Sequence, residues 1–590
     1  MTDPVQVNGL CKAYRAGRGL KRVYEDFSLR IADSARLVCL MGPDGAGKST
    51  LMKLLAGVLR PDQGQVRLCG MVPDSSDLAF TSKVGYMSQT LGLYGELTVR
   101  ENLEIFAALR GMDVRKNAAD LDGILRKVGL FEFSNRQADS LSGGMKQKLG
   151  LACAVCACPR CLILDEPTVG VDPVSRQELW AITLDYVRRE GAFCLFSSAY
   201  LEEAAAADQA VMLQNGRIVL QGAAAQLRTG LQGRTFAVST GDLPYTATVR
   251  RLMFSSRHFL DDSPLLDICP RMGRIDVLAA PGATVQSLGV FLKEKMPDAA
   301  FGLKVAPREP QLEDVYVAHT LDFSQKTALP DPGAAFERRT VIDVRGICKR
   351  FGSFTAVRHS DFKVQKGEIF GLLGPNGAGK TTTFRMICAL LKPTEGQVTV
   401  GGYDLRTAKS DLRAHIGYVS QKFSLYRKLT ARQNLEYFGR SYGISGSKLK
   451  KRVEELLDEF SLRGSADDLS ESLPFGLQRQ LSMACALIHR PEVLFLDEAT
   501  SGADPMARRT FWNRVCALSS GGTTVVVTTH FMDEAEYCDR FLIQDRGRIL
   551  VLGTPDEVCT QGGRRVSIED AFVALVHQFR QQEGRHAQDA

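Results

Sequence analysis

The sequence predicts an α/β fold in which two similar domains follow one another, with a small α+β appendage between them. The 590 residues contain two versions of one sequence, since Lys48 matches Lys380 and Gln89 matches Gln421, both pairs 332 positions apart. In each version an apolar, strand-like run leads into a glycine-rich loop and then a helix-like stretch. A register that holds across separated motifs indicates a tandem duplication.

Length and composition indicate a multidomain globular protein. A chain of this size suits three or four domains, and its 44% hydrophobic and 24% charged residues are ordinary. No apolar run approaches the roughly 20 residues of a membrane span, and the N-terminal sequence lacks the pattern of a secretory signal. The net charge of +7 is mild and indicates no nucleic-acid-binding tail.

The cysteines do not indicate a disulfide framework, because their number, 15, is odd and the chain is long enough to build a core without one. We therefore expect a reducing compartment. The four cysteines of CAVCACPRC, Cys153 to Cys161, leave two interpretations open: a zinc or iron–sulfur site, or small apolar side chains. We favour the second, since ligands divided between a helix and a strand end converge poorly.

Domain boundaries follow from the extent of the repeat. The appendage has no counterpart in the second copy; RTFAVST, GRIDVLAA and FGLKVAP predict strands, and TVQSLGVFLKEKM predicts an amphipathic helix. The proline- and glycine-containing segment ALPDPGAAFERR predicts a linker. The expected parts are the first domain (1–230), the appendage (231–325), the linker (326–340), the second domain (341–557) and a helical tail (558–590).

The glycine-rich loops MGPDGAGKST and LGPNGAGKTT fit the phosphate-binding pattern G-x-x-x-x-G-K-[ST], each between a strand and a helix. Glycines let backbone N–H groups turn inward around an anion, the lysine reaches the β- and γ-phosphates, and Ser49 or Thr381 binds Mg²⁺. Both domains are therefore expected to be P-loop NTPases. The expected phosphate-binding residues are Gly42, Gly45, Gly47, Lys48, Ser49 and Thr50, and Gly374, Asn376, Gly377, Gly379, Lys380, Thr381 and Thr382.

Paired carboxylates end an apolar run in each copy, at CLILDEPT and VLFLDEAT. Such a run predicts a buried parallel strand whose carboxyl end carries the chemistry. We expect Asp165 and Asp497 to hold Mg²⁺ through water, and Glu166 and Glu498 to polarise the attacking water. General-base assistance is typically worth about 10²–10⁴ in rate.

The segment LSGGMKQKL, which begins at Leu141, resembles the signature motif of the ATP-binding cassette (ABC) ATPases. The tandem layout and appendage resemble the YbhF-like class of exporter ATPases within that family. The resemblance implies ATP and Mg²⁺ as ligands and His530 as a switch histidine at the γ-phosphate. Further roles that it implies are nucleotide contacts by Ser142, Gly143 and Gly144, Mg²⁺ binding by Gln89 and Gln421, with Gln421 also in the catalytic set, D-loop roles for Asp172 and Asp504, and adenine stacking by Tyr14 and Phe351.

The two copies differ at family positions. Ala199 stands where the second copy has His530, and Pro474 and Phe475 stand where the first has Ser142 and Gly143. The resemblance implies that the two cassettes pair head to tail within one chain. Both changes then fall in the composite site of Lys48, which we expect to hydrolyse ATP slowly or not at all. An alternative is that both sites hydrolyse ATP, with Ser198 or Tyr200 compensating for the histidine.

Two functions remain open at this point. The first is an ATPase subunit that powers export through separate transmembrane permease subunits, two in number, and lies peripherally at the cytoplasmic face of the cell membrane. The second is an ABC ATPase that acts on ribosomes or nucleic acid. The appendage carries ten basic and ten acidic residues between Arg234 and Asp314, so it offers little attraction for phosphates. We therefore favour the exporter and expect no nucleic-acid partner.

Overall fold

The computed structural model describes residues 3–16, 19–241, 243–271, 273–297, 302–323, 337, 339–405, 407, 412, 414–421, 424–561 and 564–588. The expected linker, 326–340, thus lies largely outside the described residues. The chain forms two compact units. The first contains Met1–Leu231, Pro310–Thr320 and Asp504–Met506, and the second contains Gln232–Glu309, Leu321–Ala503 and Ala507–Ala590.

The first unit is built on a six-stranded sheet of order β5-β6-β7-β3-β8-β9, parallel except for the edge strand β9. Every residue of its central strands β3, β6 and β7 is buried, which explains why these segments are continuous apolar runs. An antiparallel sheet β2-β1-β4 accompanies it. The strands are β1 (Val5–Ala16), β2 (Gly19–Ile31), β3 (Leu37–Met41), β4 (Gln63–Leu68), β5 (Val84–Met87), β6 (Cys161–Asp165), β7 (Phe193–Ser197), β8 (Gln209–Gln214) and β9 (Arg217–Gly222).

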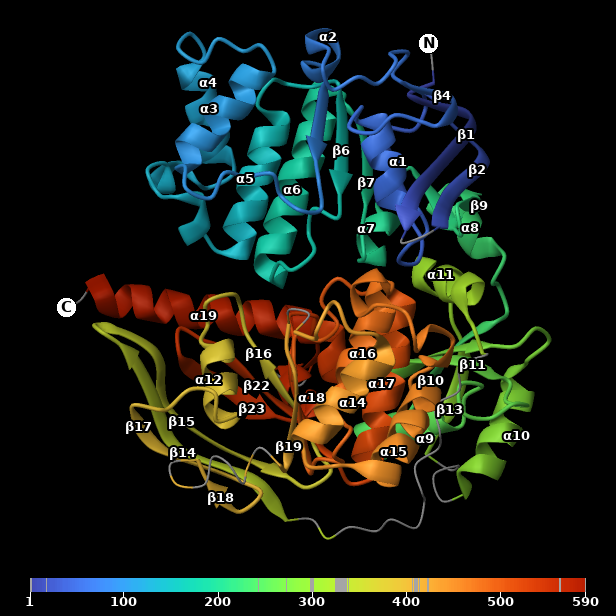
Figure 1. Cartoon of the computed structure of the whole chain (residues 1–590), viewed down its shortest axis with the longest axis vertical. Helices are drawn as coiled ribbons and strands as arrows, with labels where there is room; N and C mark the ends of the chain where they lie inside the picture. Colours follow the sequence, from blue (N-terminus) through green and yellow to red (C-terminus); the bar gives the residue numbers. More distant parts are fainter. Residues whose placement is uncertain are drawn as a thin grey trace. The chain divides into compact units, whose positions relative to one another are not determined.

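The helices of the first unit include a separate helical region. Helices α3, α4 and α5 share their own apolar core and lie at one end of the large sheet, opposite β1 and β2 (Figure 1). The helices are α1 (Lys48–Leu55), α2 (Leu78–Thr81), α3 (Val99–Leu109), α4 (Ala118–Lys127), α5 (Gly143–Val155), α6 (Pro173–Glu190), α7 (Leu201–Ala205), α8 (Ala224–Thr229) and α11 (Leu312–Thr320), with 3₁₀ turns η1 (Phe131–Phe133) and η2 (Ala138–Ser140).

The second cassette repeats this architecture in the second unit, with sheets of order β19-β20-β21-β16-β22-β23 and β15-β14-β17-β18. Its strands are β14 (Thr340–Phe351), β15 (Phe354–Gln365), β16 (Ile369–Leu373), β17 (Glu395–Val400), β18 (Tyr403–Asp404), β19 (Ile416–Val419), β20 (Val493–Asp497), β21 (Thr524–Thr528), β22 (Arg540–Asp545) and β23 (Arg548–Gly553). Its helices are α12 (Lys380–Ile387), α14 (Ala431–Ser441), α15 (Gly446–Glu459), α16 (Phe475–Ala486), α17 (Pro505–Ser520) and α18 (Pro555–Cys559), with 3₁₀ segments η4 (Arg463–Ser465), η5 (Ser470–Ser472) and η6 (Met532–Tyr537).

The C-terminal tail is mostly helical. A short hairpin, β24 (Thr560–Gln561) and β25 (Arg564–Arg565), separates α18 from the long helix α19 (Ile568–Gln588). Helix α19 contacts η6, just as α11 contacts α7 in the first unit. The two helices are therefore equivalent parts of the repeat, and the rest of the appendage is inserted ahead of α11.

The appendage is an antiparallel sheet of order β11-β12-β10-β13 with two helices. Strands β10 (Thr235–Ser239), β12 (Arg274–Ala279) and β13 (Lys304–Pro307) and helix α10 (Val285–Lys295) occupy the predicted segments. Strand β11 (Leu265–Arg271) and helix α9 (Tyr245–Phe254) were not predicted, because Pro270 and the β-branched residues of α9 weaken their local patterns. The appendage lies beside α17 and shares a continuous apolar core with the second cassette (Figure 1).

Among the described residues, no helix is long and apolar enough to span a bilayer. Cys69 and Cys161, 92 positions apart, form a disulfide at the ends of β4 and β6. The sequence did not indicate this pair, because the two cysteines lie far apart in the chain and only the fold brings them together. Within the described part of the chain, no group of three or more His, Cys, Asp or Glu side chains could hold a metal ion.

Candidate functional site

The glycine-rich loops join strand to helix in both units, as the sequence predicts. Gly47 and Gly379 directly precede α1 and α12 with φ of 108° and 100°, a backbone conformation that glycine adopts readily. Lys48 Nζ donates to the carbonyl of Gly42 at 2.6 Å, and Lys380 Nζ likewise donates to the carbonyl of Gly374. Both lysines are buried, so each loop presents a fixed positive charge within a ring of backbone groups.

The remaining predicted loop residues lie at equivalent positions in the two cassettes. Ser49 and Thr50 lie in the first turn of α1, and Thr381 and Thr382 lie in the first turn of α12. Gly42, Gly45, Gly374, Asn376 and Gly377 lie in the loops between strand and helix.

Hydroxyl and carboxylate oxygens meet beside the first loop. Asp165 Oδ1 accepts hydrogen bonds from Ser49 Oγ at 3.1 Å and Ser197 Oγ at 2.9 Å. Its other oxygen, Oδ2, is buried and has no hydrogen-bond partner among the described residues. A buried carboxylate oxygen beside a hydroxyl fits Mg²⁺, a hard cation that prefers oxygen ligands. In the second cassette, Asp497 Oδ1 accepts from Thr528 Oγ1 at 2.7 Å, as Asp165 Oδ1 does from Ser197 Oγ.

Each predicted glutamine donates to the glutamate that follows the strand carboxylate. Gln89 Nε2 lies 2.7 Å from Glu166 Oε2, and Gln421 Nε2 lies 2.6 Å from Glu498 Oε2. Two distant segments of each cassette therefore converge on one carboxylate. Glu166 and Glu498 also share a positive φ, 51° and 45°, which marks a constrained turn at the strand end.

His530 distinguishes the second cassette. Its Nδ1 lies 3.6 Å from Glu498 Oε2, and its Nε2 is buried without a hydrogen-bond partner among the described residues. Burial alone would raise the pKa of Glu498, but His530, Lys380 and Arg479 outweigh it and lower the pKa below the ordinary glutamate value. Glu498 is thus held as a carboxylate.

The first cassette lacks this interaction. Ala199 is buried at the matching place, and Ser198 Oγ beside it donates to Glu203 at 2.6 Å, not to Glu166. Burial raises the pKa of Glu166, although the charge of Lys48 opposes the shift. The two equivalent carboxylates therefore have pKa values displaced in opposite directions.

Arg479 is a residue of the second site that the sequence analysis did not identify. From α16 its guanidinium donates to the backbone carbonyl of Gln421 at 2.7 Å, and its charge helps to lower the pKa of Glu498. The repeat places Gln147 at the matching position of the first cassette. No motif could have indicated this residue, because its effect depends on the packing of α16 against the Gln421 segment.

The signature segments begin helices α5 and α16. Ser142 Oγ accepts a hydrogen bond from Met145 N at 3.3 Å and caps α5, whereas Pro474 gives α16 no side-chain cap. Ser142 and Gly143 are exposed, and Gly144 is buried against Ser175. The side chain of Phe475 lies outside the described residues.

The two predicted D-loop aspartates cap helices. Asp172 Oδ1 accepts from Ser175 N at 3.1 Å, and Asp504 Oδ1 accepts from Met506 N at 2.9 Å. Within the first unit, Asp504 Oδ2 also accepts from Asp44 N at 3.1 Å. Burial and then the charge of Asp504 raise the pKa of Asp44 to about 7.

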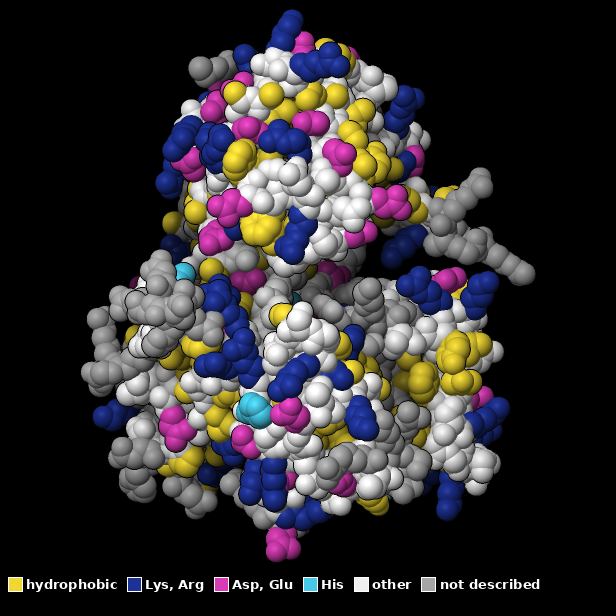
Figure 2. Space-filling model, turned by 90° about the vertical axis from the view of Figure 1, so that its left-hand side faces the viewer, with side chains coloured by type: hydrophobic (Ala, Val, Ile, Leu, Met, Phe, Trp, Pro, Cys, Tyr) yellow, Lys and Arg dark blue, Asp and Glu magenta, His cyan; other side chains and the backbone are white. Residues whose placement is uncertain are grey.

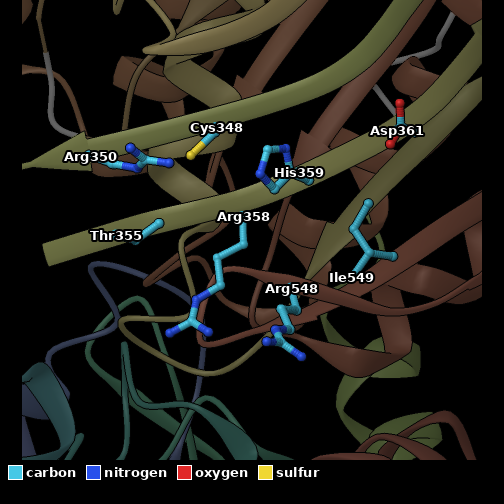
Figure 3. A pocket seen from close by; sticks show the side chains of 8 residues that line it. All are labelled: Cys348, Arg350, Thr355, Arg358, His359, Asp361, Arg548 and Ile549. Atoms are coloured by element: carbon cyan, nitrogen blue, oxygen red, sulfur yellow. The ribbon is translucent and has the colours of Figure 1, made fainter.

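The predicted adenine-stacking rings lie in the last residues of two long strands. Tyr14, two residues before the end of β1, has its hydroxyl 3.3 Å from Thr50 Oγ1, and Phe351 ends β14 with 51% of its surface exposed. A pocket of about 700 Å³ is lined by residues of β14, β15 and β23, among them Arg350, the residue before Phe351 (Figure 3). Its lining residues are Cys348, Arg350, Thr355, Arg358, His359, Asp361, Arg548 and Ile549.

Comparisons with known proteins agree with this geometry. The family model described as ABC transporter matches residues 24–169 and 357–501. The chain is 40% identical over 555 residues, 92% of each protein, to the probable multidrug ABC transporter ATP-binding protein YbhF of Escherichia coli K12. It is 40% identical over 244 residues to the linearmycin resistance ATP-binding protein LnrL of Bacillus subtilis, covering 40% of this chain and 78% of that protein.

One solved structure, described as the ATP-binding subunit of an ABC transporter, is 28% identical and covers 40% of this chain and all of that one, with a TM-score of 0.38. Two family matches in tandem and a relative that spans nearly the whole chain agree with the two sets of loops, glutamines and carboxylates described above. The chain belongs to the ABC transporter family, as a tandem ATP-hydrolysing ATP-binding protein of the YbhF-like class.

Proposed function

We propose that this chain powers export through separate transmembrane permease subunits and that ATP hydrolysis is concentrated at the site of Lys380. The names of its relatives, which include multidrug, linearmycin resistance and daunorubicin resistance proteins, support an export role. Two permease subunits, a location on the cytoplasmic face of the membrane and pairing of the two cassettes within the chain complete the proposal.

The observation that carries the asymmetry is the contact between His530 and Glu498. Glu498 stays ionised because His530, Lys380 and Arg479 lower its pKa against the effect of burial, so it is suited to accept a proton from the attacking water. Gln421 fixes one oxygen of this carboxylate, and the buried Nε2 of His530 is suited to donate to the γ-phosphate. Mg²⁺, when bound beside Thr381 and Asp497, would neutralise charge on the β- and γ-phosphates.

The site of Lys48 is proposed to bind ATP and turn it over slowly. It has the loop, Gln89 and Glu166, but Ala199 offers no side-chain donor to a phosphate. In the proposed head-to-tail pairing its partner motif begins with Pro474, which has no N–H to donate. Donors directed at a developing anion are each worth about 3 kcal/mol, so two losses in one site would slow hydrolysis strongly.

A matched pair of substitutions tests this proposal. In the complex assembled with its permeases, Glu498→Gln should abolish most ATP hydrolysis, with a loss of at least ~10² in kcat. Glu166→Gln should reduce it only slightly, because that carboxylate serves the slower site. Equal losses from the two substitutions would show that both sites hydrolyse ATP and would overturn the asymmetric part of the proposal.

The ribosome or nucleic-acid function gains no support. The relatives named above are ATP-binding proteins of transporters or of drug resistance. On the face drawn in Figure 2, Lys and Arg side chains are interspersed with acidic, hydrophobic and uncharged ones. Such mixing gives less attraction for a polyanion than a continuous basic area would.

A further inference from the structure

The appendage packs onto the segment that follows His530. Strand β11 and helix α9 both contact η6, which begins two residues after the histidine. Phe236 and Val277 of the appendage sheet and Trp512 and Tyr537 of the second cassette belong to one apolar core. The appendage and the second cassette are therefore continuous in packing, and η6 lies at their boundary.

One buried guanidinium connects the three elements that meet there. Arg509 of α17 is 7% exposed, and its Nε lies 3.6 Å from Asp267 Oδ2 of β11. Its Nη1 lies 3.3 Å both from the backbone carbonyl of Ile268 and from the hydroxyl of Tyr537, the last residue of η6. Trp512 stacks on the Tyr537 ring at a centroid distance of 4.8 Å, which fixes the end of η6 further.

A second ion pair holds the residues just beyond η6. Arg250 of α9 donates to Asp539 Oδ2 at 2.5 Å, and the same oxygen accepts from the backbone N–H of Ile369 at 2.8 Å. Ile369 begins β16, the strand that leads into the loop of Lys380. Asp539 therefore joins the appendage to the central sheet of the nucleotide site.

Two of the residues that contact the appendage, Arg509 and Tyr537, are specific to the second cassette. The repeat places Gln177 opposite Arg509 and Ala206 opposite Tyr537, so the first cassette lacks both the guanidinium and the ring. Asp208, which matches Asp539, accepts from the backbone N–H groups of Arg36 and Leu37 at 2.8 Å each. The aspartate at the strand start is thus common to both copies, whereas Arg509 and Tyr537 occur in the copy that carries the histidine.

We propose that the appendage is a positioning element for hydrolysis at the Lys380 site: Asp267, through Arg509, fixes η6 and with it the placement of His530 against Glu498. This inference rests on the proposed function, in which that site is the hydrolytic one. A short 3₁₀ segment has few internal hydrogen bonds, so its placement depends on tertiary contacts. A displacement of about 1 Å at a reacting group can cost ~10²-fold in rate.

The test is Asp267→Asn in the full-length chain carrying Glu166→Gln, which isolates the Lys380 site. This isosteric change removes the charge that faces Arg509 and His258. We expect kcat to fall by about tenfold, less than the ~10²-fold cost of a full 1 Å displacement of the reacting group. The KM for ATP and the affinity for a fluorescent ATP analogue should stay unchanged, because Lys380 and Phe351 do not contact the appendage carboxylate. Asp267→Glu, which restores the charge, should recover part of kcat.

Asp276→Asn is the matched control. Asp276 is a buried carboxylate on the neighbouring strand β12, and it forms ion pairs with Arg274 at 3.0 Å and with Arg308 at 3.3 Å, two residues of the appendage itself. We expect this variant to lower the melting temperature without lowering kcat. Equal loss of kcat in both variants would show a merely structural role and would overturn the inference.

Arg509→Gln, which introduces the residue of the first cassette, gives a second measurement from the other side of the contact and should reproduce the loss of kcat. If Asp267→Asn and Arg509→Gln leave kcat intact while Glu498→Gln abolishes hydrolysis, the inference fails and the proposed function stands. If Glu498→Gln costs no more than Glu166→Gln, the proposed function itself fails, and the two failures are therefore distinguishable.

Discussion

The imidazole Nδ1 of His530 lies 3.6 Å from the carboxylate of Glu498, and no equivalent pair exists between Ala199 and Glu166 in the described first cassette. The two sites otherwise match closely, since Gln89 and Gln421 each donate to the following glutamate at 2.7 and 2.6 Å. The two sites therefore differ in this interaction and in Arg479, which is Gln147 in the first cassette, and not by the loss of the whole site.

Removal of the switch histidine should affect rate and spare binding. His530→Ala is expected to lower kcat by about 10²-fold, since a positioned donor and a carboxylate partner are lost together. The affinity for ATP should change little, because it depends on the loop around Lys380 and on the ring of Phe351. Ala199→Ser is the control at the matching buried position and should leave kcat unchanged; a large effect there would contradict the assignment of hydrolysis to the second cassette.

The rate should depend on pH through Glu498. His530, Lys380 and Arg479 lower its pKa despite burial, so the carboxylate persists well below neutral pH. His530→Gln removes the part of this lowering that comes from His530, so the pKa of Glu498 should rise. The acid limb of the kcat–pH profile should then move to higher pH. Residual rates measured from pH 5 to 8 in buffers of equal ionic strength test this, and an unmoved acid limb would argue against Glu498 as the titrating group.

The same carboxylate affects folding stability. Because the folded-state pKa of Glu498 is lowered, it stabilises the folded chain at pH values above the ordinary glutamate pKa of 4.5, and this stabilisation is lost as the pH falls through the lower folded value. Glu166 has a raised pKa, so ionising it in the folded chain costs stability. Chemical denaturation should accordingly show Glu166→Gln to be more stable, and Glu498→Gln less stable, than the parent at neutral pH.

Glycines in the second loop should differ sharply in their tolerance of a methyl group. A Cβ on Gly379 would lie 2.5 Å from the backbone oxygen of Ala356, whereas one on Gly377 would meet nothing within 4 Å. Both have positive φ, 100° and 81°, so each substitution carries a backbone strain of about 1–2 kcal/mol. Gly379→Ala should abolish ATP binding at this site, and Gly377→Ala, the control, should weaken it modestly. Equilibrium titration with an ATP analogue distinguishes them.

The signature serine should serve the opposite site. Ser142→Ala removes the cap of α5 and should cost about 1 kcal/mol of stability. If the cassettes pair head to tail, this change also removes a phosphate donor from the Lys380 site, and kcat should fall by about tenfold or more. Pro474→Ala, the matching control at the start of α16, should leave kcat unchanged. An unaffected rate in Ser142→Ala would contradict the proposed pairing.

The sequence alone determined the repeated architecture and most of the candidate site. A phosphate loop requires glycines at a fixed spacing before a lysine, and a buried parallel strand requires an apolar run, which here ends in carboxylates. Both are local patterns, so they can be recognised from the sequence without knowledge of tertiary contacts. Lys48, Lys380, Asp165 and Asp497 accordingly lie where the motifs predict. The exchange of His530 for Ala199 was readable too, because the repeat aligns the copies.

Only the tertiary structure decided how these groups act on one another. The opposite pKa shifts of Glu166 and Glu498 depend on distances between segments far apart in the chain. The contacts of Arg479 with the Gln421 segment, and of Asp267 and Arg509 with η6, have no local signature, because a single arginine or aspartate acquires its role from the surface that folding brings against it. The strength of a charge interaction depends on distance and burial in the folded chain. The sequence therefore identified the interacting groups but not how strongly they interact.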